Sequence, residues 1–447
     1  MDCSFVWGVA SAAYQIEGGY REDGKGDSIW DVMTHEPGKT QKGDTGDIAC
    51  DHYHRYEEDV DWMAKLGVGG YRFSVSWSRV LPDGIGMPNE KGLAFYDRLI
   101  DALLAHGIEP YLTLYHWDLP QKLFERGGWL NPDAPDWFAQ YAELIGKRFG
   151  DRVKYYITLN EPSNVLEGMK AGGGNAPGLA YSRHDRLTAI HHLLLAHGKA
   201  VQTLRRVVPE AKIGFAPCST VICPADTEAE TVELARKRYF SLKKDDLCGN
   251  VTLFSDPIFL GQYPPEYFEY YADILPEIRE GDMELISTPV DFCFQNIYSG
   301  ETIGQNGKRI KKHVPTNMLG WPICPEAMYW GPKFLYERYK KPIYITENGL
   351  PNADVISLDG KVHDPQRVDF IARYTRELLR AGDDGVDIRG YFYWSVTDNL
   401  EWELGYGPRF GLIFVDFDTQ ERIPKDSFFY YRDMIAGEND ESKNSVL

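Results

Sequence analysis

Two short segments each place a glutamate just after an apolar, β-rich stretch. Glu161 follows residues 155–159 in Thr-Leu-Asn-Glu-Pro, and Glu347 follows residues 342–346 in Ile-Thr-Glu-Asn-Gly. Parallel α/β barrels present catalytic side chains from the C-terminal ends of their strands. Two carboxyl groups on different strands suit cleavage of a glycosidic bond, because one can protonate the leaving oxygen while the other attacks the sugar or activates water. Either glutamate alone could equally be a surface residue at a strand end.

Arg72 and His116 also lie on or just after strand-like stretches. A buried arginine is costly unless it is paired, and a carboxylate nucleophile would pair it and stay ionised. The alternative for Arg72 is a structural ion pair elsewhere. His116 and the adjacent Trp117 suit a sugar, since imidazole hydrogen-bonds hydroxyl groups and indole stacks on the apolar face of a pyranose. A single histidine at a strand end is otherwise more often structural.

Aromatic residues accompany another carboxyl group after the last strand-like stretch. Glu401 stands between Trp394 and Trp402, and it could accept hydrogen bonds from two neighbouring hydroxyls. Asp398 in the same segment could instead cap a helix N-terminus. Near the first stretch, Gln15 offers an amide donor and acceptor to a diol.

Eight strand-like stretches alternate with helical segments such as 90–105 and 365–379. This alternation predicts βαβ units, and eight of them predict a single closed (β/α)8 TIM barrel. An open doubly wound sheet would carry a glycine-rich phosphate turn, and the chain has no GxGxxG or P-loop motif. Long loops at 17–54, 163–182, 219–260, 299–330 and 351–364 should build a deep pocket on the C-terminal face. The expected strands are 5–10, 71–77, 109–116, 155–161, 212–217, 291–298, 342–348 and 390–397.

Composition narrows the class of protein. The 447-residue chain has a net charge of −19, which disfavours nucleic acid and anionic membranes as partners. Its seven cysteines are scattered without CxxC spacing, so neither a disulfide framework nor a zinc site is predicted. No signal peptide and no apolar run near the roughly 20 residues needed to span a bilayer is found. We therefore expect one cytoplasmic domain over 1–447, with a frayed tail at 438–447 and no metal or organic cofactor.

Six segments together resemble glycoside hydrolase family 1, the retaining β-glucosidase-type family, from Phe5 to about Met434. They are WGVASAAYQIEG (7–18), YRFSVSWSR (71–79), YHWDLP (115–120), TLNEP (158–162), ITENG (345–349) and WSVTDNLEWELGYGPRFGL (394–412). The resemblance implies a (β/α)8 barrel with Glu161 as acid/base and Glu347 as nucleophile. It also implies that Arg72 and Tyr298 are partners of the nucleophile and that Asn296, on the same loop as Tyr298, supports catalysis. Residues implied to bind the sugar or the leaving group are Gln15, His116, Trp117, Asn160, Trp321, Trp394, Glu401 and Trp402.

The chain departs from the usual family pattern on the leaving-group side. Ser163 and Asn164 stand where an aromatic residue is often found, and Asn175 stands where histidine is common. Residues 295–298 read Gln-Asn-Ile-Tyr without a second aromatic residue, and Leu400 replaces a usual phenylalanine. These changes affect the expected aglycone and leave both glutamates in place.

The resemblance implies an exo-acting β-glucosidase for small β-glucosides or oligosaccharides, with side activity on β-galactosides or β-fucosides. Three alternatives remain. A 6-phospho-β-glycosidase would normally lack the Glu401–Trp402 pair, and a carboxylate there would repel a 6-phosphate. A non-catalytic sugar-binding barrel would not need both glutamates. A lysine-based aldolase on the same fold would need an inward lysine at a strand end, where this chain has Glu, Trp, His and Asn.

Overall fold

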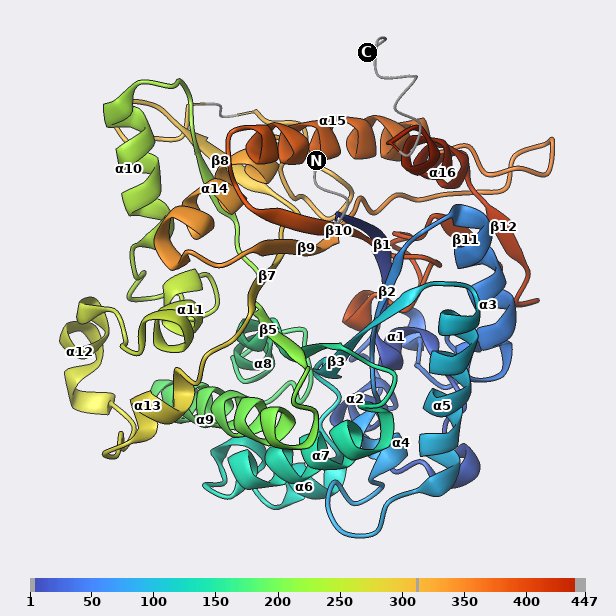
Figure 1. Cartoon of the computed structure of the whole chain (residues 1–447), viewed down its shortest axis with the longest axis horizontal. Coiled ribbons are helices and arrows are strands. Elements are labelled where there is room, and N and C mark those ends of the chain that lie inside the picture. Colours follow the sequence, from blue (N-terminus) through green and yellow to red (C-terminus); the bar gives the residue numbers. More distant parts are fainter. Residues whose placement is uncertain (1–4, 311–312, 439–447) are drawn as a thin grey trace.

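Eight parallel strands close into a barrel in the order β1-β10-β9-β7-β5-β4-β3-β2. The computed structural model describes residues 5–310 and 313–438. In Figure 1 the blue β1 lies beside the red β10, and these two strands pair in parallel to close the sheet. The predicted closed (β/α)8 barrel is confirmed. Its strands are β1 (Val6–Ala10), β2 (Gly70–Ser74), β3 (Glu109–Tyr115), β4 (Tyr155–Asn160), β5 (Lys212–Ala216), β7 (Phe292–Asn296), β9 (Ile343–Asn348) and β10 (Ile388–Trp394).

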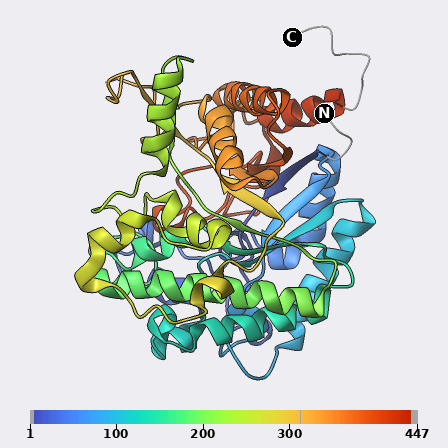
Figure 2. The same ribbon diagram turned by 60° about the vertical axis from the view of Figure 1, so that its left-hand side comes forward.

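Helices surround the barrel on its outer side in Figures 1 and 2, and α7 and α9 run side by side in both views. Predicted helix 90–105 is α5, which buries its apolar stripe at Leu93, Tyr96, Leu99, Ile100 and Leu103. Predicted helix 365–379 is the longer α15. The principal helices are α3 (His52–Leu66), α5 (Glu90–Ala105), α7 (Ala134–Phe149), α9 (Arg183–Val207), α14 (Ala327–Tyr339), α15 (Pro365–Asp383) and α16 (Asp426–Glu438).

Large aromatic side chains fill the inside of the barrel. Tyr111, Phe294, Tyr344 and Phe392 pack there with small residues such as Ala10. Glycine on the neighbouring strands makes room for these rings: a Cβ on Gly8 would lie 2.5 Å from the Phe392 ring. The barrel interior is therefore a packed core, and any site must lie at its C-terminal end.

Four of the five expected loops contain regular structure, so that part of the prediction is wrong in detail. Segment 219–260 folds as β6, α10 and α11, and β6 pairs in parallel with β8 from segment 299–330. Segment 351–364 is the expected irregular loop. Sequence periodicity missed these elements because α11 is buried nearly all round, whereas α10 buries only Thr231, Ala235 and Tyr239.

The remaining elements lie in the connections between barrel strands or in the segment that follows β10. The frayed tail expected at 438–447 lies outside the described residues, except for the last residue of α16. The short elements are α1 (Ala13–Ile16), η1 (Glu22–Gly24), α2 (Ile29–Thr34), η2 (Gln41–Gly43), α4 (Trp77–Val80), α6 (Gln121–Glu125), η3 (Gly128–Leu130), α8 (Pro162–Gly168), β6 (Val221–Pro224), α10 (Ala229–Phe240), α11 (Val251–Leu260), α12 (Pro265–Tyr271), η4 (Ala272–Ile274), α13 (Asp282–Ile286), β8 (Gly300–Ile303), η5 (Trp402–Leu404), β11 (Ile413–Val415) and β12 (Arg422–Pro424).

Candidate active site

A cavity of about 800 Å³ lies at the C-terminal ends of the barrel strands. Most of the residues selected from the sequence line it, and they come from segments after five different strands. Those lining residues are His116, Trp117, Glu161, Tyr298, Trp321, Glu347, Trp394, Glu401 and Trp402. The other selected residues, Gln15, Arg72, Asn160 and Asn296, are fully buried. The structure therefore gathers the lining set in one place and puts the buried set beneath or beside it.

Glu347, near the end of β9, is paired with a cation and a phenol. Arg72 on β2 donates from Nη1 to the Glu347 carboxylate and, at 3.2 Å, to the carbonyl of Thr346. The Tyr298 hydroxyl donates to the other Glu347 oxygen at 2.7 Å. Arg72 is 0% exposed and Glu347 is 3% exposed, so each charge would be costly without its partner. This pairing favours an ionised Glu347.

Glu161 connects β4 to α8 in a left-handed backbone conformation, with φ 38° and ψ 62°. Pro162 disfavours the right-handed helical region for the residue before it, and Pro162 itself begins α8 at a position where proline is favourable. The Glu161 N–H donates to the carbonyl of Ala216 at the end of β5, at 2.7 Å. Such a backbone conformation costs free energy in a residue other than glycine, and these costs concentrate at functional sites.

Neutral groups surround the Glu161 carboxyl. Asn296 Nδ2 donates to Oε1 at 2.6 Å, and Asn164 Nδ2 donates to Oε2 at 2.5 Å. The Cys218 thiol, two residues beyond β5, lines the cavity with Glu161, and burial, followed by the charge of Glu161, raises the pKa of this thiol. Among the described residues, no Lys, Arg or His side chain forms an ion pair with Glu161. Its surroundings therefore differ from those of Glu347.

The two carboxyl groups have different tendencies to hold a proton. Burial, followed by the charge of Glu347, raises the pKa of Glu161 to about 8. Burial also raises the pKa of Glu347, but the Arg72 charge and the Tyr298 hydrogen bond oppose that rise. Because the Arg72 charge and the Tyr298 hydrogen bond stabilise the carboxylate form of Glu347, the pair favours keeping its one proton on Glu161. At neutral pH the site can hold one carboxylate and one carboxylic acid.

A chain of amide contacts orients His116. The Asn160 side-chain oxygen accepts from Arg72 at 2.5 Å and from Asn296 at 3.0 Å, so its Nδ2 faces the His116 Nε2 at 3.0 Å. Burial and the Arg72 charge lower the pKa of His116 well below its usual value. The neutral ring therefore accepts through Nε2 and carries its proton on Nδ1. No hydrogen-bond partner is found for Nδ1 within the described chain, so it can serve a ligand hydroxyl.

Three tryptophans form an aromatic wall. The Trp117 and Trp402 ring centroids are 4.6 Å apart, and Trp394 stacks with His116 at 5.8 Å. Trp117 and Trp402 have positive φ angles of 77° and 50°, so both residues lie at tight turns of the backbone. Trp321, on the opposite connection, contacts Tyr298 at 5.4 Å between ring centroids.

Glu401 is the third carboxyl group of the cavity. Burial, and then the charges of Glu403, Glu347 and Glu161, raise the pKa of Glu401 to about 8. Within the described part of the chain, no side chain donates a hydrogen bond to this carboxyl. Nearby, Gln15 does not line the cavity: its Nε2 donates to the Leu400 carbonyl at 2.8 Å and to Asn399 at 3.2 Å. Gln15 therefore holds the segment that carries Glu401.

Sequence reasoning treated Cys218 only as one of seven scattered thiols, and Asn164 only as a departure from the family pattern. Asn164 donates a hydrogen bond to Glu161, and Cys218 lines the same cavity as Glu161. Cys218 follows the end of β5 by two residues, and the strand-end rule that selected the glutamates would have selected it too. Asn164 faces Glu161 because the first turn of α8 brings a residue three positions later back to the strand end.

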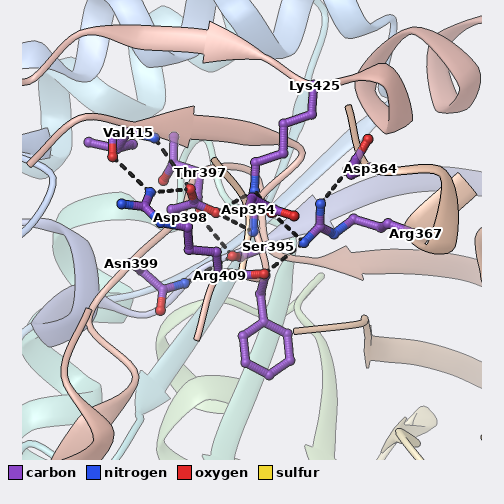
Figure 3. Close-up of polar contacts among 12 residues, drawn as sticks. Asp354, Asp364, Arg367, Ser395, Thr397, Asp398, Asn399, Arg409, Val415 and Lys425 are labelled. Atoms are coloured by element: carbon purple, nitrogen blue, oxygen red, sulfur yellow. Dashed lines mark hydrogen bonds and ion pairs between the residues drawn. The ribbon is translucent and has the colours of Figure 1, made fainter. Parts of the chain in front are cut away.

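A buried group of alternating charges, here named the charge cluster, holds the segment after β10 (Figure 3). It consists of Asp354, Asp364, Arg367, Asp398, Arg409 and Lys425. The Asp398 carboxylate forms ion pairs with Lys425 at 2.6 Å and with Arg409 at 2.7 Å. It also accepts a hydrogen bond from the Gly411 N–H at 3.0 Å. Asp398 caps no helix, because the following η5 has Glu401 at its N-cap. The cluster instead fixes the backbone three residues before Glu401.

Removing one cation from the charge cluster should destabilise the fold strongly. Lys425 is 0% exposed and contacts both Asp398 and Asp354, so Lys425→Met leaves two carboxylates short of a partner. We expect the free energy of unfolding to fall by about 3–5 kcal/mol, measured by urea denaturation. Lys122→Met is the control, because the Lys122–Glu125 pair is exposed and should leave the midpoint almost unchanged. Equal midpoints for Lys425→Met and wild type would contradict this role.

Metal binding and membrane crossing are two other properties that the described residues can be checked for. Over residues 5–310 and 313–438, no group of three or more His, Cys, Asp or Glu side chains could hold a metal ion. In the same ranges, none of the helices combines the length and apolar character that crossing a membrane requires.

Comparison with known proteins gives concordant results. The model of glycosyl hydrolase family 1 matches residues 1–440. The chain is 43% identical over 438 residues to beta-glucosidase A of Thermotoga maritima, covering 96% of each protein. It is 41% identical over 468 residues to an aryl-phospho-beta-D-glucosidase of Bacillus subtilis, again covering 96% of each. A solved structure of the Thermotoga maritima beta-glucosidase in complex with noeuromycin superposes with a TM-score of 0.89 at 42% identity, covering 98% of each chain.

Proposed function

The chain belongs to glycosyl hydrolase family 1, and we propose that it is an exo-acting, retaining β-glucosidase that releases terminal non-reducing β-D-glucosyl residues from small β-glucosides. One observation carries the proposal. In a single cavity, Glu347 is paired with Arg72 and Tyr298, whereas Glu161 has only neutral donors and a pKa raised to about 8. Such a pair supplies an ionised nucleophile and a protonated acid at the same pH.

The proposed reaction is a double displacement. Glu161 gives its proton to the glycosidic oxygen while Glu347 attacks the anomeric carbon, which forms a glycosyl-enzyme and frees the aglycone. Glu161, now ionised, takes a proton from the water that cleaves the intermediate. Arg72 and Tyr298 hold Glu347 before the attack, and Asn296 holds Glu161. No metal or organic cofactor is part of this proposal.

The aromatic wall and the polar groups beside it suit a neutral hexose. His116 Nδ1, the Trp117 and Trp402 rings and the Glu401 carboxyl are the proposed contacts of the glucosyl unit. Trp321 and Asn164 lie where the aglycone would leave. The proposal includes slower turnover of β-galactosides and β-fucosides, which a panel of nitrophenyl β-glycosides tests.

Product stereochemistry tests the proposed mechanism. Hydrolysis of a nitrophenyl β-glucoside, followed from its first turnovers by NMR, should release β-glucose before it mutarotates to the α-anomer. First appearance of α-glucose would indicate inversion and overturn the double displacement. No release of glucose by the wild-type enzyme would favour the non-catalytic alternative.

The 6-phosphoglucosidase alternative gains weight from the Bacillus subtilis relative, whose name describes that activity. The surroundings of Glu401 favour a neutral substrate instead. Glu347, which Arg72 and Tyr298 favour in its ionised form, is one of the groups whose charge acts on Glu401, and it would repel a phosphate placed there. The aldolase alternative would need a lysine at a strand end, and the lining lysine, Lys243, lies in the connection after α10.

Replacing Glu401 by serine tests the choice between neutral and phosphorylated sugars. Two sugar hydroxyls can hydrogen-bond to the Glu401 carboxyl group, and such bonds contribute about 1 kcal/mol each when the group is protonated and about 1.5–3 kcal/mol each when it is ionised. Glu401→Ser should therefore lower kcat/KM for nitrophenyl β-glucoside by at least about 10-fold. It should also reduce the ratio of kcat/KM for the glucoside to kcat/KM for the corresponding 6-phosphoglucoside. The matched control is Glu403→Gln, which changes a neighbouring carboxyl. Efficient cleavage of the 6-phosphoglucoside by wild type would contradict both the role of Glu401 and the substrate class.

We also propose that residues 1–447 form one catalytic domain in the cytoplasm. The family match over 1–440 and the single barrel built from β1 to β10 support the domain. Six free cysteines among the described residues support a reducing compartment.

A further inference from the structure

Two cysteines far apart in the sequence stand in identical tripeptides, Ile-Cys-Pro at 222–224 and again at 323–325. Cys223 lies in β6, and Cys324 lies just before α14. Their sulfur atoms are 3.8 Å apart. That distance is a contact between two thiols, and a modest approach would bring them to the roughly 2.0 Å of a disulfide bond.

The two thiols differ in their access to a reagent. Cys223 is 0% exposed, whereas Cys324 is 5% exposed and lines a second cavity of about 340 Å³, which shares Glu301, Arg309 and Pro322 with the wall of the candidate active site. Thr302, Pro322 and Glu326 also line this second cavity. A small molecule in the cavity would therefore meet Cys324 first, and Cys223 would lie behind it.

The contacts of the pair favour the same order of reaction. The 3.8 Å Sγ–Sγ contact with Cys223 lowers the pKa of Cys324, although burial and the nearby Glu326 carboxylate oppose this effect. The same contact, with burial, raises the pKa of Cys223 well above its usual value. The thiolate is the nucleophile in thiol chemistry, so Cys324, which lines the second cavity, is also the thiol whose pKa is lowered.

Closing the pair would move the connection that carries Cys324. Cys223 is held in the β6–β8 ladder opposite Thr302, so it has little freedom to shift. Cys324 lies outside any helix or strand. Its N–H donates to Tyr374 on α15 at 2.8 Å, its carbonyl accepts the Ala327 N–H at 3.1 Å, and its Sγ contacts Glu326 at 3.7 Å. Trp321 and Pro322, two or three residues earlier, line the active-site cavity. A shift of Cys324 by somewhat under 2 Å would therefore be passed on to Trp321 and Pro322, here named the leaving-group wall.

We propose that Cys223 and Cys324 form a redox-active dithiol that accepts oxidising equivalents from low-molecular-weight disulfides and adjusts the leaving-group wall. The Cys324 thiolate attacks one sulfur of the small disulfide, forms a mixed disulfide and releases one small thiol. The Cys223 thiol then attacks the Cys324 sulfur, loses its proton and releases the second small thiol. In sum, one small disulfide is reduced to two thiols and the two cysteines are oxidised to one disulfide.

Oxidised glutathione is the probe for the chemical step. Wild-type protein treated with it should lose two hydrogen atoms in mass and yield a non-reduced peptide that joins Cys223 to Cys324. Cys223→Ser should stop at a glutathione adduct on Cys324, whereas Cys324→Ser should form no adduct at Cys223. Cys293→Ser, which changes a cysteine fully buried in β7, is the matched control and should react like wild type. Absence of the joined peptide in wild type, or an adduct at Cys223 in Cys324→Ser, would overturn the proposal.

Measurements of kcat/KM test whether oxidation alters the leaving-group wall, and only this experiment rests on the proposed function. The oxidised wild type should show a several-fold or greater change in kcat/KM for cellobiose, because small misplacements of positioning groups can cost up to about 10²-fold. Dithiothreitol should reverse the change, and Cys324→Ser should not show it. An unchanged kcat/KM in fully oxidised protein would refute the coupling to the active site. Failure of β-glucoside turnover in the reduced protein would instead refute the proposed function.

Discussion

Glu347→Gln should lower kcat for nitrophenyl β-glucoside by on the order of 10⁴- to 10⁶-fold, comparable with the loss of a catalytic nucleophile elsewhere. Each tenfold loss corresponds to about 1.4 kcal/mol of transition-state stabilisation. Glutamine keeps the shape of the side chain and an acceptor for Arg72, so the fold should survive. No glycosyl-enzyme should form, which mass spectrometry after quenching with a slow fluoro-sugar substrate can check.

Glu109→Gln is the control for Glu347→Gln. Glu109 begins β3 at the opposite end of the barrel, where residues serve stability more than catalysis. It should keep kcat within about 2-fold of wild type. If Glu347→Gln kept substantial activity, or still accumulated a covalent intermediate, Glu347 would not be the nucleophile.

The effect of Glu161→Ala on kcat/KM should depend on whether the leaving group of the substrate must be protonated. For cellobiose, whose leaving group must be protonated, we expect a loss of kcat/KM on the order of 10²–10⁴-fold. For an activated dinitrophenyl glucoside the first step should survive and the glycosyl-enzyme should accumulate, because the general base for its hydrolysis is missing. Added azide should restore turnover and yield a glucosyl azide. Equal losses on the two substrates, without rescue by azide, would contradict the assignment of Glu161.

The same variant gives a test of pH dependence. Glu161 must be protonated to act as the acid, and its pKa is raised to about 8, so kcat/KM for cellobiose should fall as pH rises through about 8. On the acid side, activity should fall as Glu347 takes up a proton. Glu401, Cys218 and Arg72 also face this part of the site, and the pKa of Glu401 is likewise raised to about 8. An alkaline limb that persists in Glu161→Ala on the activated substrate would belong to Glu401 instead.

Much of the architecture was predictable from local patterns. Each expected strand overlaps a barrel strand, with ends that differ by at most three residues, because runs of apolar β-branched and aromatic residues indicate strands buried on both faces. The strand-end positions of Glu161 and Glu347 followed directly from that pattern. The connections were harder, since β6, α10 and α11 are stabilised by packing on the barrel and show little periodicity of their own.

The sequence by itself determined the barrel, the two glutamates and the set of sugar-type residues, because strand alternation and motif spacing are local properties of the chain. Tertiary structure alone decided which carboxyl group keeps its proton. Arg72 on β2 reaches Glu347 on β9 across 275 positions of sequence, and Asn296 on β7 reaches Glu161 across 135 positions. It also decided that Asp398 belongs to the charge cluster and that Cys223 meets Cys324. Such contacts depend on how distant segments pack, and burial sets the strength of their electrostatics.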